Sequence, residues 1–364
     1  MEQFSEEQTH YMNVSNTSEE IKRIIKCYKD NKEFELNIKY EKSKFDDKKW
    51  CEELSNKFNE LRHKFDNLDC FLSRYYIENI EEKIYSLEFF YKFSKNDEVK
   101  SKYITLPPKD IYEDAIEILK KNKYEEVENM SDEYKPKISP QESQKRLQKI
   151  IDDKGFDWKV NICDNMVPRM SVRPYKEFRI SGNCKFSEVD LESLRVHEIE
   201  VHTARKYWGL QTGLYLFLYG LNSNNTYDEG IAIYNSLHKL KKPKPNILFF
   251  IAIKIVMMYN LDKMSPLKIF KLVKKLTDAP DDVIALSLIR INRVSNNHLM
   301  FTNSANSDSI DMDYLKGYTI VKDMTENERQ ELIKYSIGPK QLFELENIKK
   351  FLKINKFKPR NYKL

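Results

Sequence analysis

The sequence predicts an α+β fold in which α-helices predominate and a small antiparallel sheet lies near the middle of the chain. Over much of the length, apolar residues recur at spacings of three and four, as in Ile21, Ile24, Ile25 and Tyr28. This is the pattern of an amphipathic helix. Between residues 158 and 180 the period changes to two, which is typical of half-buried strands. With 40% apolar residues in 364 positions, the chain can bury a sizeable core.

The composition describes a mildly basic protein. Lys and Arg number 62 against 57 Asp and Glu, a net charge of +5, which is too evenly mixed to indicate nucleic-acid binding but suits an acidic protein substrate. The five cysteines are scattered and form no C-x-x-C pair. The first residues lack the apolar run of a signal peptide. We therefore expect reduced thiols and a cytoplasmic protein.

The expected organisation is a polar helical N-terminal extension over residues 1–55 and one domain over 56–364. The motifs of this domain lie at 157–240, and it ends in a basic tail. The most apolar stretch, residues 247–259, is too short to cross a bilayer and contains Lys254. It predicts a buried helix, so we expect no membrane partner.

Three short strands are predicted, joined by turns into an antiparallel sheet, at residues 158–162, 170–172 and 178–180. In the second strand, Arg169, Ser171 and Arg173 share one face, whereas Met170 and Val172 share the other. The arginine face is either an ordinary solvated surface or part of a substrate site. The alternation alone does not decide between the two.

The helix expected after the sheet has a well-defined start. Ser187 is placed as its N-cap with Asp190 at the N3 position, and Phe186 can pack on Leu191 across the cap. The segment VHEIEVH, residues 196–202, therefore lies about two to three turns inside a helix, where ligands can be presented rigidly.

His197, Glu198 and His202 match the H-E-x-x-H pattern of zinc peptidases except for one extra residue. At i and i+4 two imidazoles of a regular helix can reach one zinc ion, but at i and i+5 they point about 140° apart. A π-helical turn, with hydrogen bonds from i to i+5, would return both rings to one face. We therefore predict a π-bulge between Ile199 and His202. The alternative is an amphipathic helix that carries two histidines by chance.

A hydrolytic zinc site takes three protein ligands and leaves one position for water, so a third ligand is needed. Glu229 is the candidate. The alternative is structural, because Thr226 and Glu229 have the spacing of a capping box, in which the Glu bonds the N-cap amide. In a zinc site, Glu198 would take the proton of the water and pass it to the leaving amine. Glu200 is interpreted as a surface residue.

The runs FSEVDLESLRVHEIEVHTARKYWGLQ and YDEGIAIY carry a resemblance to a known family. They resemble the bacterial "QEGLA motif" family, once linked to flavohaemoglobin expression, and its eukaryotic relatives, the microtubule-associated tyrosine carboxypeptidases. The resemblance implies a zincin-like metallopeptidase domain with one Zn²⁺ ion, and it implies His197, His202 and Glu229 as ligands. It further implies Glu198 as general base and the removal of a C-terminal residue, which is tyrosine in the eukaryotic relatives.

The chain departs from the family pattern at three positions. Asp228 stands where the family has Gln before Glu-Gly, Ile231 where it has Leu, and Glu200 where a small residue is common. None of these is an implied ligand. Asp228 and Glu200 would, however, add negative charge near the mouth of the site, which bears on the substrate.

A carboxypeptidase must bind the free α-carboxylate of its substrate, and a guanidinium does this best. Five arginines are candidates, of which we expect one or two in the site: Arg169, Arg173, Arg205, Arg290 and Arg293. Tyr234 is a candidate hydrogen-bond donor to the oxyanion, and its position fits core packing equally well.

The first interpretation is thus a zinc-dependent carboxypeptidase acting on the C-terminus of a protein or peptide. A zinc endopeptidase or small-peptide hydrolase would use the same chemistry. An alternative of another class is a non-catalytic regulator that binds a partner through its N-terminal helices, and nucleic-acid binding is a distant third. The basic tail, residues 348–364, is either a solvated face or an attachment to an acidic partner.

Overall fold

The computed structural model divides the chain into two compact units. The first is formed by Met1–Tyr124 and Leu248–Met312, and the second by Glu125–Ile247 and Asp313–Leu364. The motif region expected at 157–240 lies wholly in the second unit. The residues whose structure is described are 14–39, 47–68, 72–95, 106–164, 169–173, 176–212, 214–219, 225–292, 310–335 and 344–354.

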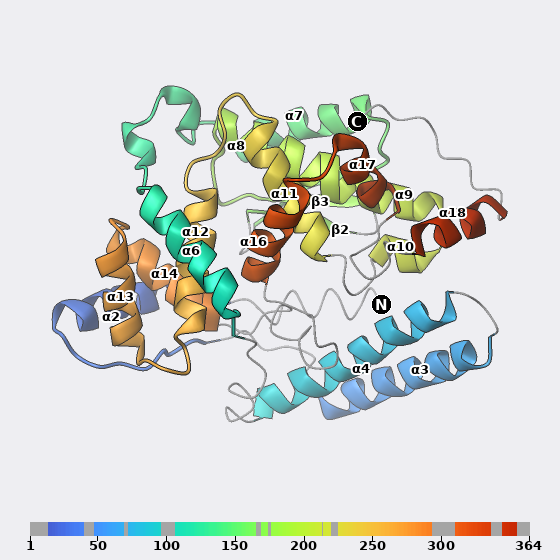
Figure 1. Ribbon diagram of the computed structural model, residues 1–364, viewed down its shortest axis with the longest axis horizontal. Helices are drawn as coiled ribbons and strands as arrows, with labels where there is room; N and C mark the ends of the chain where they lie inside the picture. The colour runs from blue at the N-terminus through green and yellow to red at the C-terminus, as the bar shows by residue number, and fades with distance from the viewer. Residues whose placement is uncertain are drawn as a thin grey trace. The chain divides into compact units, whose positions relative to one another are not determined.

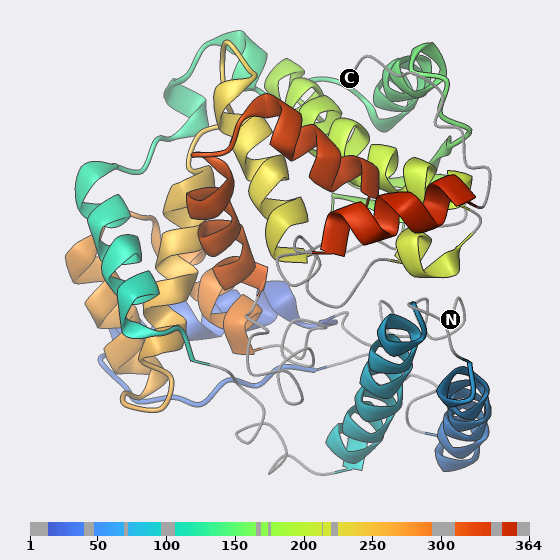
Figure 2. The same cartoon turned by 45° about the vertical axis from the view of Figure 1, so that its right-hand side comes forward.

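The first unit is helical in its described part. Its helices are α2 (Thr17–Lys29), α3 (Lys48–Asp66), α4 (Ser73–Lys95), α6 (Lys109–Lys121), α12 (Ile247–Tyr259), α13 (Pro266–Leu276) and α14 (Asp281–Asn292). The expected border at residue 55 falls inside α3. α3 and α4 pack along each other (Figures 1 and 2). α2 packs on α13 and α14, and its Tyr28 stacks on Phe270 with ring centroids 4.2 Å apart. The helices predicted from apolar spacing are therefore confirmed.

Helix α12 confirms the buried helix expected at residues 247–259. Eight of its thirteen residues are buried, so its apolar side chains belong to the protein core. Among the helices that the structure describes, none is long and apolar enough to cross a membrane.

The second unit contains the sheet and most of the predicted motifs. Its strands are β1 (Lys159–Cys163), β2 (Met170–Arg173) and β3 (Glu177–Ser181). Two short 3₁₀ turns, η2 (Val127–Asn129) and η3 (Asp132–Tyr134), precede the first long helix. The other helices are α7 (Pro140–Asp153), α8 (Glu188–Leu194), the π-helix η4 (Arg195–Thr203), α9 (Ala204–Gln211), α10 (Tyr215–Tyr219), α11 (Asn225–His238), α16 (Ile310–Val321), α17 (Glu326–Tyr335) and α18 (Leu345–Ile354).

The three strands form a mixed sheet in the order β1-β3-β2. β3 pairs parallel with β1 and antiparallel with β2, so the expectation of an all-antiparallel sheet is wrong for β1. The reason is that alternation shows which side chains share a face but carries no information on strand direction. Val160 lies opposite Phe178, and Ile162 lies opposite Ile180. The predicted apolar positions thus still meet within the sheet.

Helix α7 covers the edge of the sheet at β1. Gln144 Nε2 donates a hydrogen bond to the carbonyl oxygen of Val160 at 2.7 Å, and the amide of Val160 donates to Gln148 Oε1 at 2.8 Å. Leu147 and Ile151 of the same helix are fully buried. These glutamines satisfy backbone groups that an edge strand would otherwise leave unpaired.

The described part of the basic tail is a packed helix rather than a fully solvated face. Ile348 of α18 is fully buried, and Lys349 forms ion pairs with Glu331 and Glu346. Residues 355–364, which carry the remainder of the tail, lie outside the described residues.

Candidate metal centre

The helix that carries the motif begins as the sequence predicts. Ser187 Oγ accepts from the amide of Asp190 at 2.9 Å, and Asp190 Oδ2 accepts from the amide of Ser187 at 3.0 Å. This reciprocal pair is a capping box, and it satisfies two of the backbone donors that a helix N-terminus leaves open. Phe186 and Leu191, on either side of the cap, are both buried. The start of the motif helix is therefore fixed.

The predicted π-bulge is confirmed and is longer than one turn. Residues Arg195–Thr203 form a π-helix, whose backbone hydrogen bonds run from i to i+5. His197 and His202, five residues apart, consequently lie on the same face, with ring centroids 5.2 Å apart. Val196, Ile199 and Val201 of the same segment are fully buried. The widened helix thus points its histidines to one side and its aliphatic residues into the core.

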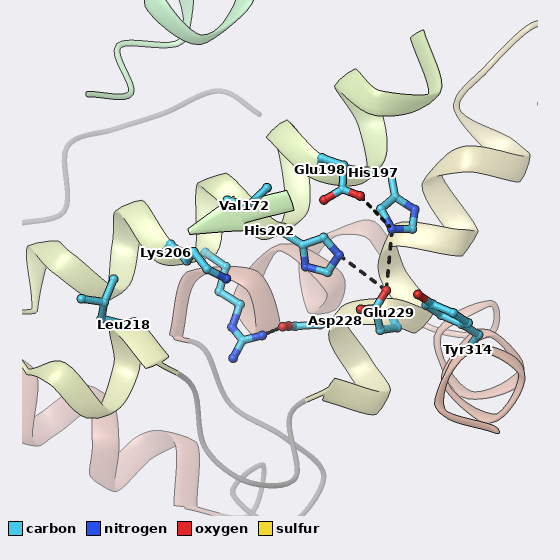
Figure 3. A pocket seen from close by; sticks show the side chains of 10 residues that line it. Val172, His197, Glu198, His202, Lys206, Leu218, Asp228, Glu229 and Tyr314 are labelled. Carbon is cyan, nitrogen blue, oxygen red and sulfur yellow. Dashed lines mark ion pairs between the residues drawn. The ribbon is translucent and has the colours of Figure 1, made fainter. Parts of the chain in front are cut away.

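Helix α11 supplies a carboxylate to these two rings. Glu229 Oε2 lies 3.6 Å from His197 Nε2 and 3.5 Å from His202 Nε2 (Figure 3). This oxygen is buried and has no hydrogen-bond partner among the described residues. The capping-box alternative does not hold, because α11 already begins at Asn225 and the hydroxyl of Thr226 donates to Asp313 Oδ1 at 2.5 Å. Glu229 is therefore free of a structural role at the helix start.

The spacing of Glu229 Oε2 from the two imidazole nitrogens suits a tetrahedral metal ion. Zn–N and Zn–O bonds of about 2.0–2.1 Å at tetrahedral angles place neighbouring ligand atoms about 3.3–3.4 Å apart. The distances of 3.5 and 3.6 Å from Glu229 Oε2 to the two imidazole nitrogens are close to this value. A buried carboxylate oxygen without a hydrogen bond also needs a positive partner. The donor set of two imidazoles and one carboxylate is one that zinc takes in hydrolases.

A hydroxyl on α11 orients the first histidine. Ser236 Oγ lies 3.3 Å from His197 Nδ1 and donates its own proton to the carbonyl oxygen of Ala232 at 2.8 Å. Because the serine has a single proton, its oxygen can only accept from His197, so Nδ1 carries the hydrogen. Nε2 of the neutral ring then presents its lone pair towards Glu229, as a metal ligand requires.

A second side-chain bond ties α11 to the π-helix. Asn235 is buried, and its Nδ2 donates to the carbonyl oxygen of Val196 at 3.3 Å. α11 therefore provides Glu229 and, about two turns later, two polar contacts to the widened helix. One helix thus carries the candidate third ligand and the contacts to His197 and Val196.

Glu198 is the second carboxylate of the centre. Its side chain, His197 and His202 offer donor atoms that lie within 4.8 Å of one another, so Glu198 competes with Glu229 for the role of third ligand. Glu198 Oε1 is 3.8 Å from His197 Nε2, whereas Glu229 Oε2 lies closer to both rings. This difference favours Glu229 as ligand and leaves Glu198 beside the centre, where a general base would lie.

The electrostatics of the cluster couple its carboxylates to its imidazoles. Burial raises the pKa of Glu229, but the two imidazoles, His202 first, outweigh it and hold this pKa far below its usual range. Burial lowers the pKa of His197, yet Glu198 and Glu229 outweigh it, so the net shift is upward. Both shifts have the same physical cause, the attraction of buried carboxylates for a cation at this point.

A pocket of about 250 Å³ opens over the centre. It is lined by His197, Glu198, His202 and Glu229, and around them by Val172, Arg205, Lys206, Leu218, Asp228 and Tyr314 (Figure 3). All these residues belong to the second unit.

The strand arginines do not line this pocket. Arg169 pairs with Asp190 at 3.0 Å, and its guanidinium lies over the ring of Phe186. The residue of β2 that reaches the pocket is Val172, so Arg173, its neighbour in the strand, belongs to the other face. The alternation in β2 separates Val172 from the arginines, but it does not show which face of the strand turns towards the pocket.

Of the remaining candidate arginines, one reaches the pocket. Arg205 lines it and forms a buried ion pair with Asp228. Arg290 is exposed on α14, in the first unit. Arg293 lies outside the described residues. The expectation that one or two of the five would be at the site is thus met by Arg205 alone among those described, and its charge is already neutralised.

The two acidic departures from the family pattern do not add net charge at the mouth. Asp228 is paired with Arg205. Glu200 is not a surface residue, because its exposure is 8% and its Oε1 lies 2.6 Å from Arg195 Nη1 and 3.1 Å from Lys154 Nζ. The sequence pattern indicates exposure for a charged residue whose partners are not known. In the structure, Arg195 and Lys154 neutralise Glu200, so its side chain can be buried.

Tyr234 does not reach the pocket. Its ring packs against His238 at 4.6 Å between centroids, and the guanidinium of Arg329 lies 4.0 Å from its ring centroid. The tyrosine that lines the pocket is Tyr314, whose hydroxyl lies on the side of Glu229 (Figure 3). The core-packing alternative for Tyr234 is the one that the structure supports.

A contact between glycines explains how Tyr314 reaches the site. Gly230 and Gly317 touch where α11 crosses α16, and a Cβ on Gly230 would lie 2.3 Å from the backbone of Gly317. Glu229 directly precedes Gly230, and Tyr314 precedes Gly317 by about one turn. The close approach of the two backbones therefore brings both side chains to one place. The segment DYLKGY carried a signal for this, since a glycine within a helix indicates close packing.

Lys206 is a further pocket residue, which is absent from the site residues predicted by the motifs. It follows His202 by four residues and therefore faces the same side of the helix. Burial, followed by repulsion from Arg205, lowers its pKa to about 8. The charges of Glu198 and Glu229 oppose this shift. The i+4 spacing from a candidate ligand was the sequence signal that could have found it.

Comparison with known families agrees with the resemblance to the microtubule-associated tyrosine carboxypeptidases. A family model described as microtubule-associated tyrosine carboxypeptidase matches residues 28–241. The match covers more than half of the chain and includes the π-helix and Glu229. A search among curated proteins gives no match.

Proposed function

Because the chain belongs to the microtubule-associated tyrosine carboxypeptidase family, we propose that it is a zinc-dependent carboxypeptidase that removes the C-terminal residue of a protein or peptide. Family membership points to a carboxypeptidase-type enzyme with a protein substrate. The observation that carries the zinc proposal is the buried oxygen of Glu229, which has no hydrogen bond and faces two imidazole nitrogens at 3.5 and 3.6 Å.

In this proposal His197, His202 and Glu229 hold one zinc ion. When bound, zinc would polarise the scissile carbonyl and lower the pKa of water. Glu198, beside His197, accepts the proton of the attacking water and delivers it to the leaving amine. Ser236 keeps Nδ1 of His197 protonated, so that Nε2 remains available as a ligand.

Tyr314 takes the role that the sequence assigned to Tyr234. Its hydroxyl lines the pocket beside Glu229 (Figure 3), where it can donate a hydrogen bond to the oxygen of the carbonyl under attack. A donor at this position stabilises the negative charge that develops in the transition state.

The pocket suits a small part of a substrate. Its volume of about 250 Å³ is below the range of about 300–1,000 Å³ that is usual for small-molecule sites. Its lining is mostly polar, and Val172 and Leu218 add a small apolar part on the side away from Glu229 (Figure 3). These features suit one terminal side chain, and the family makes tyrosine the first residue to test.

The test compares two peptides that end in tyrosine, one with a free carboxylate and one amidated, by mass spectrometry before and after incubation with the zinc-loaded protein. We expect loss of tyrosine from the free acid only. The Glu198→Gln variant should retain zinc and lose about 10²–10⁴-fold in kcat, because it removes the general base.

Glu200→Gln is the matched control, since Glu200 lies on the same π-helix but pairs with Arg195 and Lys154. It should retain activity. Cleavage inside the amidated peptide would replace the proposal with an endopeptidase. A zinc-free protein that cleaves neither peptide would favour the non-catalytic regulator.

A further inference from the structure

The pocket holds two cationic side chains besides the imidazoles, and they differ in their partners. Arg205 and Lys206 are adjacent in α9 and both line the pocket. Arg205 is in an ion pair with Asp228, and both members are buried. Its charge is therefore neutralised within the protein. Among the described residues, no carboxylate forms an ion pair with the ammonium of Lys206.

The position of Lys206 relative to the metal centre suits a group that touches the substrate. As residue i+4 from His202 it lies on the ligand face of the helix, and Figure 3 shows it next to His202, across the pocket from Tyr314. It is half-buried rather than solvated. A half-buried ammonium that lines a pocket gains most from an anion that enters the pocket.

The charge balance of the pocket leads to the same residue. The two site carboxylates, Glu198 and Glu229, would face the metal and the attacking water, and Asp228 is paired with Arg205. Each negative charge of the lining thus has an assigned partner. Arg173 adds to the positive potential at Lys206 from outside the lining. An anionic group of the substrate would find its counter-charge at this end of the pocket.

We propose that Lys206 binds the terminal α-carboxylate of the substrate and thereby restricts the enzyme to free C-termini. This inference rests on the proposed function. It replaces the expectation of an arginine fork, since the arginines that the structure describes are paired, turned away or outside the pocket. A lysine binds a carboxylate as a point charge, with less directional constraint than a guanidinium.

The experiment measures binding rather than turnover. The tyrosine-terminated peptide is titrated as free acid and as amide into zinc-loaded Glu198→Gln protein, which turns over slowly enough for binding to be measured. The titration is repeated with Lys206→Met added to this background. We expect the background protein to prefer the acid. Lys206→Met should reduce this preference about 10- to 100-fold, because a hydrogen bond to a charged group is worth about 1.5–3 kcal/mol. Binding of the amide should stay unchanged.

Two further variants keep the result interpretable. Lys206→Arg retains the positive charge and should retain most of the acid preference. Lys239→Met removes an exposed lysine that pairs with Glu326 outside the pocket, and it should change nothing. If Lys206→Met fails to fold, as judged by zinc content and circular dichroism, Lys206→Gln takes its place with the same expectation.

The outcomes separate the two proposals. If the wild-type protein removes tyrosine but Lys206→Met keeps the full acid preference, Lys206 does not bind the carboxylate and the carboxypeptidase assignment stands. If Lys206→Met weakens acid and amide equally, the residue has only a structural role and the inference is overturned. If the wild-type protein cleaves neither peptide, the proposed function itself fails.

Discussion

The π-helix η4 and the α-helix α9 that continues it are one length of chain with two helical periods, and they present different chemistry. η4 carries His197, Glu198 and His202 and ends at Thr203. α9 begins at Ala204 and presents Arg205 and Lys206 to the same pocket. The first segment thus gathers two imidazoles and a carboxylate, and the second gathers cations.

The difference shows what the extra residue of the motif does. In η4 the i to i+5 hydrogen bonds bring two imidazoles to one face, which a regular helix could not do at that spacing. In α9 the regular period sets adjacent residues about 100° apart. One cation can then reach Asp228 on α11 while the next follows His202 along the pocket. Substitutions that affect η4 should therefore change zinc binding or kcat, and those at the α9 end should change recognition of the carboxylate.

Among the variants that test this separation of catalysis from carboxylate recognition, Tyr314→Phe should have the largest effect on kcat. Tyr314 belongs to neither helix but lines the pocket beside Glu229. Loss of an oxyanion donor should lower kcat about 10²–10³-fold, while zinc content and the preference for acid over amide stay as in the wild type. Steady-state kinetics and elemental analysis measure these quantities.

Tyr234→Phe is the matched control for this variant. Its ring packs between His238 and Arg329 rather than in the pocket, so it should leave kcat unchanged. A Tyr314→Phe enzyme with wild-type kcat would remove the hydroxyl from the proposed chemistry.

Ser236→Ala should have a smaller effect, and it should act on zinc affinity through His197. Ser236 fixes the tautomer of His197 without touching the pocket, and loss of such a support costs about 10–100-fold in metal affinity. Competition with a zinc-binding dye measures this affinity. Saturating zinc should restore most of the activity, and the acid preference should not change. A shift in the acid preference would contradict the claim that η4 and α9 have separate roles in zinc binding and carboxylate recognition.

The sequence was sufficient for the parts of the site that one helix determines. The spacing of His197 and His202 required a local widening if both were ligands, and the π-helix is present. The start of the helix at Ser187 followed from its capping pattern. The role of Glu229 could not be decided from the sequence, because its spacing from Thr226 fits a capping box as well as a ligand. Only the approach of α11 to η4 distinguishes the capping role from the ligand role.

Features that depend on packing between distant segments could not be read from the chain. Period two in β2 did not show that Val172, rather than the arginines, would face the pocket. It also did not show that β1 would pair parallel with β3. Glu200 was assigned to the surface because Arg195 and Lys154 could not be identified as its partners. Tyr314 is brought to Glu229 by a helix crossing at Gly230 and Gly317, some 87 positions apart in the chain.

The measurement that tests the central claim most directly is the zinc content of the wild-type protein and of Glu229→Ala, by elemental analysis after purification in zinc without chelators. The account predicts one zinc per chain in the wild type and in the Glu200→Gln control, and loss of bound zinc in Glu229→Ala with helical content retained. A wild-type protein without zinc, or a Glu229→Ala variant that binds it as tightly as the wild type, would contradict the account.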